Sequence, residues 1–110
     1  MRVYLDNCCY NRPFDEQAQL RVVLETLAKL NIQQQMRDGV LEYAWSSVLD
    51  FEISKSRFLD RSLQIMPWAK GAVINVQIDD AIRFRAKEFE NNGLKAMDAL
   101  HVACAEAAEC

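Results

Sequence analysis

The sequence has no apolar run that approaches the roughly 18 residues needed to cross a bilayer. Its first residues, Met-Arg-Val-Tyr-Leu-Asp, reach an acid before an apolar signal region can develop. Internal repeats, linkers and low-complexity segments are absent as well. These absences exclude a membrane-spanning protein, and a chain of 110 residues has the size of one domain. We expect a single cytoplasmic domain with no membrane partner.

Cysteine motifs are also lacking. The four cysteines, Cys8, Cys9, Cys104 and Cys110, form neither a Cys-x-x-Cys pair nor an array with zinc-ligand spacing. We therefore expect free thiols in a reducing compartment. Cys104, on an apolar helix, is expected in the core, while Cys8 and Cys9 are expected to line a site without acting in it.

Glycine is scarce, and the first of the three glycines is Gly39. The sequence thus has no glycine-rich loop after its first predicted strand that could cradle a phosphate. It also has no lysine on a late strand. Both absences count against one alternative, a flavodoxin-like or receiver-like module in which Asp6 would be an acidic-pocket residue or a phosphoacceptor.

An excess of positive charge is missing too, because the net charge is −3 at pH 7. This balance argues against a protein that coats nucleic acid regardless of sequence. It is compatible with an enzyme that acts on nucleic acid, because carboxylates can bind phosphate through a divalent cation.

Strand and helix patterns alternate along the chain. Apolar, β-prone runs at residues 2–6, 40–45 and 72–77 predict three strands. Leucines at three- and four-residue spacing predict a long amphipathic helix over residues 15–38, and further helices are expected after Ser47, over residues 60–70, after Asp80 and from Asp98. This alternation is typical of an α/β fold with a parallel sheet and right-handed crossovers.

Local signals predict several boundaries. Residues 11–14 are expected to form a loop because Pro13 disfavours helical angles at Arg12. The spacing Ser47-x-x-Asp50 resembles a capping box at the start of a helix. Asp79 and Asp80 are expected to cap the helix that follows them rather than to bind a metal.

Three separated acids are candidates for one site. Asp6 ends the first strand, where α/β sheets place ligands. Glu52 lies between two apolar residues near the buried face of its helix, where an unpaired carboxylate is costly. Asp98 opens the last helix. Each has a structural alternative: Asp98 could stabilise its helix N-terminus, and Glu52 could sit at the rim of the apolar face or pair with a lysine.

These three positions carry a resemblance that covers essentially the whole chain. Residues 3–7 are Val-Tyr-Leu-Asp-Asn, residues 46–52 are Ser-Ser-Val-Leu-Asp-Phe-Glu, and residues 95–101 are Lys-Ala-Met-Asp-Ala-Leu-His. In this order they resemble a PIN-domain protein. Members of that family are metal-dependent ribonucleases, many of them the toxin of a bacterial VapBC-type toxin–antitoxin pair. The resemblance implies a three-layer α/β/α fold with a short parallel sheet.

The resemblance also implies roles for single residues. Asp6, Glu52 and Asp98 would be the catalytic acids and would bind Mg²⁺ or Mn²⁺, with Asn7 and Ser46 as supporting polar residues. The ion would activate a water for hydrolysis of an RNA phosphodiester, leaving 5′-phosphate and 3′-hydroxyl ends. Candidates for binding the RNA backbone are Arg12, Lys55 and Arg57, although solvated surface charge explains them equally well. His101 is expected to be a hydrogen-bonded histidine beside the core.

The chain departs from the family pattern after the helix of Asp98. Family members normally continue into a further strand, a loop with a fourth acid, and a last strand and helix, whereas this sequence ends at Cys110. The strand of Asp6 would then have an open apolar edge, which favours pairing with another chain. We therefore expect, beside an antitoxin partner, a homodimer or a strand-exchanged oligomer. The alternative function is a catalytically silent, truncated PIN module that binds protein or dimerises.

Overall fold

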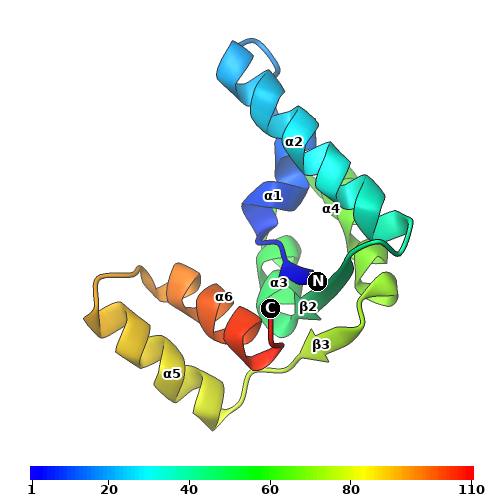
Figure 1. Ribbon diagram of the computed structural model, residues 1–110. Coiled ribbons are helices and arrows are strands. Elements are labelled where there is room, and N and C mark those ends of the chain that lie inside the picture. The colour runs from blue at the N-terminus through cyan, green and yellow to red at the C-terminus, as the bar shows by residue number, and fades with distance from the viewer.

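The computed structural model describes residues 1–110 and contains a parallel three-stranded sheet between two groups of helices (Figure 1). The elements in chain order are β1 (Arg2–Tyr4), α1 (Asn7–Asn11), the 3₁₀ helix η1 (Arg12–Phe14), α2 (Leu20–Arg37), β2 (Glu42–Ser46), α3 (Ser47–Ser54), α4 (Leu59–Ile65), the 3₁₀ helix η2 (Met66–Gly71), β3 (Ile74–Val76), α5 (Asp80–Asn91) and α6 (Ala96–Ala107). The predicted α/β class is thus confirmed.

The sheet has the strand order β1-β2-β3, and both strand pairs are parallel. Val3 lies opposite Tyr43, and Trp45 lies opposite Asn75. β1 and β3 are shorter than the sequence predicts, with three residues each. Asp6 is still extended but is not part of β1, because the pairing with β2 ends at Tyr4. β1 is an edge strand, so β2 is the centre of the sheet.

Side chains alternate across β2 and divide the core in two. Ala44 faces α5 and α6, whose small residues allow close helix packing; the buried residues on this side are Ala44, Val48, Val76, Ile82, Ala86, Ala99, Ala103, Cys104 and Ala108. Tyr43 and Trp45 face α1, α2, α3 and α4; the buried residues on that side are Leu5, Tyr10, Met36, Tyr43, Trp45, Leu49, Ile53 and Ile65. Helices therefore cover both faces of the sheet.

The loop predicted over residues 11–14 is wrong. α1 runs to Asn11, and η1 continues it as a 3₁₀ helix. Pro13 stands at the start of η1, where a residue without an N–H group removes no hydrogen bond. Asp6 caps the start of α1, so the chain is helical directly after β1.

The cap of α3 also differs from the prediction. Ser46, not Ser47, is the N-cap, and its hydroxyl accepts a hydrogen bond from the Leu49 N–H at 3.3 Å. The Ser47 hydroxyl instead accepts the Ile78 N–H at 3.2 Å. Asp79 caps α5 as expected, accepting from the Ile82 N–H at 2.8 Å.

The leucines of α2 do not form its buried face. Leu20, Leu24 and Leu27 are 74%, 56% and 58% exposed. The N-terminal part of α2 extends past the body of the molecule, and its C-terminal part packs on the sheet through Met36 (Figure 1). Ionic contact between Arg12 and Glu25, at 3.3 Å, connects the extended part of α2 to η1.

No helix in the structure combines the length and the apolar character that crossing a membrane requires.

Candidate functional site

Asp6 lies where β1 ends and α1 begins. Its Oδ1 accepts the Cys9 N–H at 3.0 Å, which makes Asp6 the N-cap of α1. The second carboxylate oxygen accepts no hydrogen bond from the protein. Asp6 lines a small pocket with Tyr4, Cys9 and His101. The sequence predicts that Asp6 ends the first strand, whereas β1 ends at Tyr4 and Asp6 follows as the N-cap of α1. The capping hydrogen bond holds the side chain in place.

Glu52 is connected to the sheet by a chain of side-chain hydrogen bonds. Its Oε1 bonds to Nε2 of His101 on α6, and only 9% of the His101 side chain is exposed. Nδ1 of His101 lies 2.6 Å from the Tyr4 hydroxyl, which lies 2.7 Å from the Ser46 hydroxyl. The expected hydrogen-bonded histidine beside the core is confirmed. Glu52 is paired with this histidine rather than with a lysine.

These hydrogen bonds have one consistent direction when the imidazole is neutral. Ionised Glu52 can only accept, so Nε2 of His101 carries the hydrogen and donates. Nδ1 then accepts from the Tyr4 hydroxyl, and Tyr4 accepts from Ser46. The Ser46 oxygen in turn accepts the Leu49 N–H. The polar side chains of His101, Tyr4 and Ser46 thereby all have hydrogen-bond partners, so Glu52 has a fixed position.

Among the residues that connect Glu52 to Ser46 by hydrogen bonds, Tyr4 has a strongly shifted pKa. Burial raises the pKa of its hydroxyl well above the usual value, and the nearby carboxylates of Glu52 and Asp6 raise it further. The hydrogen bond from Ser46 acts in the opposite direction but is the smaller effect. Tyr4 is therefore a neutral hydrogen-bond donor at physiological pH rather than a proton acceptor.

Asp98 is separate from the other two acids. It is exposed in the first turn of α6 and makes no hydrogen bond or ion pair. It lines neither the pocket of Asp6 nor that of Glu52. Its position matches the structural alternative, a carboxylate that complements the positive end of a helix. No group of three or more His, Cys, Asp or Glu side chains is arranged to hold a metal ion.

Asp6 and Glu52 nevertheless have suitable donor atoms for a hard cation. Each keeps one carboxylate oxygen without a hydrogen bond, since Asp6 uses Oδ1 and Glu52 uses Oε1. Mg²⁺ is commonly bound through one or two carboxylates, with water and substrate phosphate as the remaining ligands. The donor chemistry of these two residues therefore fits Mg²⁺ or Mn²⁺.

The pocket of Glu52 is rich in arginine. It has a volume of about 350 Å³ and extends from Glu52 to α1, η1 and the start of α4; it is lined by Asn7, Cys8, Asn11, Arg12, Asp15, Glu52, Ser56, Arg57, Phe58 and Arg61. Two of the three predicted RNA-binding residues, Arg12 and Arg57, are among them. The third, Lys55, is exposed outside the pocket, with its ammonium 5.7 Å from the ring centre of Phe51.

The arginines of this pocket differ in their partners. Arg61 is held by Asp15 at 2.8 Å and by the Phe14 carbonyl at 3.0 Å. Arg12 pairs with Asp15 at 3.5 Å and with Glu25. Arg57 makes no ion pair, and its guanidinium carbon lies 5.0 Å from the ring centre of Phe58. Arg57 is therefore the cation in this pocket that is free to bind an anion.

The supporting residues Asn7 and Ser46 both take part in local structure. The Asn7 side-chain oxygen accepts from the Asn11 amide at 2.8 Å and lines the arginine pocket. Ser46 is fully buried and connects the α3 cap to Tyr4. Burial and the Asp6 charge raise the pKa of the neighbouring Cys9 thiol to about 11. All four cysteines are free, and Cys104 is buried as expected.

Sequence reasoning missed Tyr4, Arg61 and Phe58. Tyr4 could have been found, because residues two apart in an extended strand point to the same side and Tyr4 precedes Asp6 by two. Arg61 had no such signal, because its partner Asp15 is 46 residues earlier in the chain. Phe58 resembles any exposed aromatic in the sequence.

Comparisons of the chain with protein-family models, with curated proteins and with solved structures found no match. The chemistry of Asp6, Glu52 and the arginine pocket is therefore the basis for assigning a function.

Proposed function

We propose that this chain is a metal-dependent ribonuclease with a PIN-like fold, acting as the toxin of a type II toxin–antitoxin pair. The observation that carries the proposal is the pocket in which Glu52 lies beside Arg12, Arg57 and Arg61. A carboxylate with a free oxygen next to several arginines suits a phosphodiester that is bound partly through a cation and partly through guanidinium groups. The ordered acids Asp6, Glu52 and Asp98 support the family assignment.

In this proposal each residue of the site has a separate task. Arg57 binds a phosphate of the RNA, while Arg12 and Arg61, already paired, shape the wall of the pocket. His101 holds Glu52, and Asp6 lines a separate small pocket together with the same histidine. When bound by Asp6 and Glu52, Mg²⁺ or Mn²⁺ would supply an acidified water and neutralise charge on the phosphate. Asp98 is a candidate third ligand.

The experiment is a Mn²⁺ titration by calorimetry beside cleavage of a labelled, mixed-sequence single-stranded RNA, with and without chelator. Glu52→Gln and Asp6→Asn are expected to abolish Mn²⁺ binding and to reduce cleavage by about a hundredfold or more. Glu16→Gln, a matched change at an exposed residue outside the site, should leave both unchanged. Products with 5′-phosphate ends would exclude a contaminating cyclising ribonuclease.

Asp98→Asn tests the third acid in the same assay. A loss of cleavage comparable to that of Asp6→Asn would mean that Asp98 joins the other acids when the ion binds. Cleavage that persists in chelator, or that survives both Asp6→Asn and Glu52→Gln, would contradict the proposal.

A second candidate is a catalytically silent module that binds a protein, either an antitoxin-like partner or a second copy. The exposed Leu20, Leu24 and Leu27 favour it, because residues spaced by four and three form one apolar stripe on α2. Sedimentation equilibrium tests the second copy: a dimer that Leu24→Gln and Leu27→Gln dissociate would support it. A monomer at micromolar concentration without RNA cleavage would leave a partner protein as the remaining role of the stripe.

A further inference from the structure

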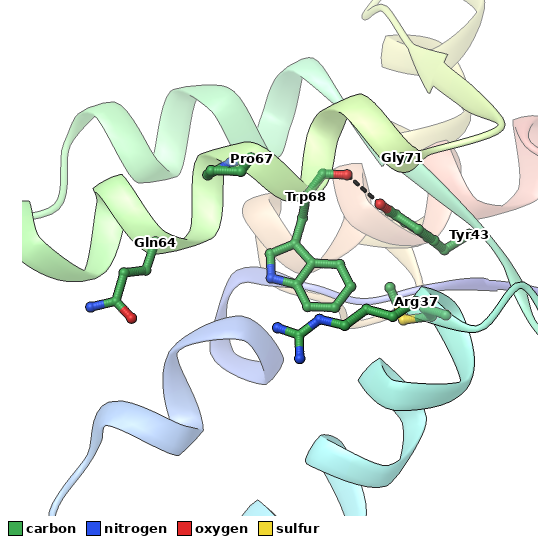
Figure 2. A pocket seen from close by; sticks show the side chains of 7 residues that line it. Arg37, Tyr43, Gln64, Pro67, Trp68 and Gly71 are labelled. Atoms are coloured by element: carbon green, nitrogen blue, oxygen red, sulfur yellow. Dashed lines mark hydrogen bonds between the residues drawn. The ribbon is translucent and has the colours of Figure 1, made fainter.

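A second open pocket is lined by neither Glu52 nor His101. It has a volume of about 450 Å³ between the end of α2 and η2 and is lined chiefly by Met36, Arg37, Tyr43, Gln64, Pro67 and Trp68 (Figure 2). Tyr43 stands near the start of β2, three residues before Ser46, which is about 10 Å along a strand. This pocket shares no lining residue with the pocket of Glu52, so an occupant would leave Glu52 accessible.

Apart from the Tyr43 hydroxyl, the side-chain donors of this pocket, on Arg37, Gln64 and Trp68, have no hydrogen-bond partner in the protein. Arg37 makes no ion pair, and its guanidinium carbon lies 4.7 Å from the ring centre of Trp68, so the cation is supported by the indole face. The indole N–H of Trp68 donates to no protein acceptor, in contrast to that of Trp45, which donates to Asp50 at 2.8 Å. No acidic residue lines the pocket.

The wall that carries these donors is fixed. The Tyr43 hydroxyl donates to the Trp68 carbonyl, as the dashed line in Figure 2 shows. A side chain at Gly71 would collide with the same hydroxyl, so η2 approaches β2 as closely as glycine permits. Tyr43 and Tyr10 also contact the Trp68 ring at its sides, with ring centres 5.9 and 6.0 Å away. The indole is therefore held in place before any ligand binds.

We propose that this pocket binds a carboxylate attached to an apolar or aromatic group. One guanidinium and two neutral donors, the indole N–H and the Gln64 amide, balance a single negative charge. A phosphate monoester carries nearly two at neutral pH and would be undercompensated. Met36, Pro67 and the indole edge offer an apolar surface for the group next to the carboxylate. The carboxylate could belong to a peptide C-terminus or to a free acid.

The test uses the two tryptophan indole N–H resonances in an NMR titration of the whole chain. N-acetyl-phenylalanine represents the peptide end, and 3-phenylpropionate represents the free acid. Either is expected to shift the Trp68 signal, assigned through Trp68→Phe, with millimolar affinity, while the Trp45 signal, already bonded to Asp50, stays in place. The tighter of the two ligands identifies the source of the carboxylate.

Arg37→Gln should weaken binding by about tenfold or more. The matched change Arg57→Gln, in the other pocket, should not. The proposal is overturned if N-acetyl-phenylalanine amide shifts the Trp68 signal as much as the acid does, if phenyl phosphate binds more tightly than the carboxylates, or if no ligand moves the signal at roughly 10 mM. None of these outcomes depends on ribonuclease activity, so this proposal and the previous one fail separately.

Discussion

Ser46 is fully buried, and its hydroxyl is shared between the cap of α3 and the Tyr4 hydroxyl. Ser46→Ala removes both hydrogen bonds without adding volume. We expect a loss of about 1–2 kcal/mol in the free energy of unfolding, because a cap is lost and a buried phenol loses its donor. Urea denaturation measures this change.

Ser54→Ala is the control for Ser46→Ala, since the Ser54 hydroxyl donates to a carbonyl at the exposed end of the same helix. It should change stability by less than about 0.5 kcal/mol. Combining Ser46→Ala with Tyr4→Phe should cost less than the sum of the single changes, because both remove the same hydrogen bond. Strict additivity would contradict the hydrogen-bond chain.

Cys9 lies beside Asp6 and is half-buried. With a pKa of about 11, its thiol has about a hundredfold less thiolate at pH 8 than an ordinary cysteine thiol, and the thiolate fraction grows as pH rises toward that value. We expect slow alkylation of Cys9 that accelerates steeply with pH. Asp6→Asn removes a negative charge, lowers the pKa and should accelerate the reaction.

Mass spectrometry of peptides after timed alkylation gives the rate at each cysteine. Cys110 serves as the internal control, because burial and Arg2 rather than Asp6 determine the shift of its pKa. An unchanged rate at Cys9 in Asp6→Asn would mean that burial alone keeps the thiol protonated.

At the level of single elements, α2 has apolar side chains that are exposed as well as apolar side chains that are buried. Leu24→Gln and Leu27→Gln should change the free energy of unfolding by less than about 0.5 kcal/mol each, because both side chains are more than half exposed. Met36→Ala, on the same helix, should cost about 2–4 kcal/mol, since Met36 is 5% exposed within the core. Urea denaturation of the three variants tests the assignment of the buried face. A large loss for either leucine would contradict it.

The leucine spacing of α2 predicted the helix correctly but indicated the wrong buried face. Periodicity identifies an apolar stripe, yet it does not say whether the fold provides a surface for that stripe. In this chain Thr26, Gln33 and Met36 are the buried residues of α2. No layer of the protein lies beneath the leucines in the extended N-terminal half of the helix. A local sequence pattern does not indicate whether the fold provides such a layer.

The strands and the cap at Asp79 were predictable because each depends on neighbours in the sequence. The choice of Ser46 over Ser47 as the cap was not predictable. The Ser47 hydroxyl accepts a hydrogen bond from the Ile78 N–H, which is 31 residues away in the sequence. The candidate site divides in the same way. The place of Asp6 just after β1 followed from a local pattern, whereas the pairing of Glu52 with His101 depends on how α3 and α6 pack.

For the whole molecule, the net charge of −3 limits how RNA can be bound. If Arg57 is the free cation of the site, binding of a single strand should weaken only modestly with salt. Arg57→Gln should then reduce the slope of log affinity against log salt concentration by about 0.7, the loss of roughly one phosphate contact. Fluorescence anisotropy with labelled RNA in chelator measures the slope.

Arg83→Gln is the control for the salt experiment, since Arg83 is an exposed arginine on α5 paired with Asp80. Its slope should equal that of the unmodified chain. If both variants lose the same slope, RNA binding follows overall charge rather than the arginine pocket.

The guanidinium of Arg2 donates to the Ala108 carbonyl at 2.7 Å, so the strand at one end of the chain is bonded to the last turn of the helix at the other. Figure 1 shows the two ends side by side. A short flexible peptide could join them, and new ends could be opened at the exposed turn of Gly39, which touches no neighbouring side chain. We expect a circularly permuted sequence in which β2 comes first to build the same sheet with helices on both faces, since the contacts that hold the layers together do not require the present order of the strands.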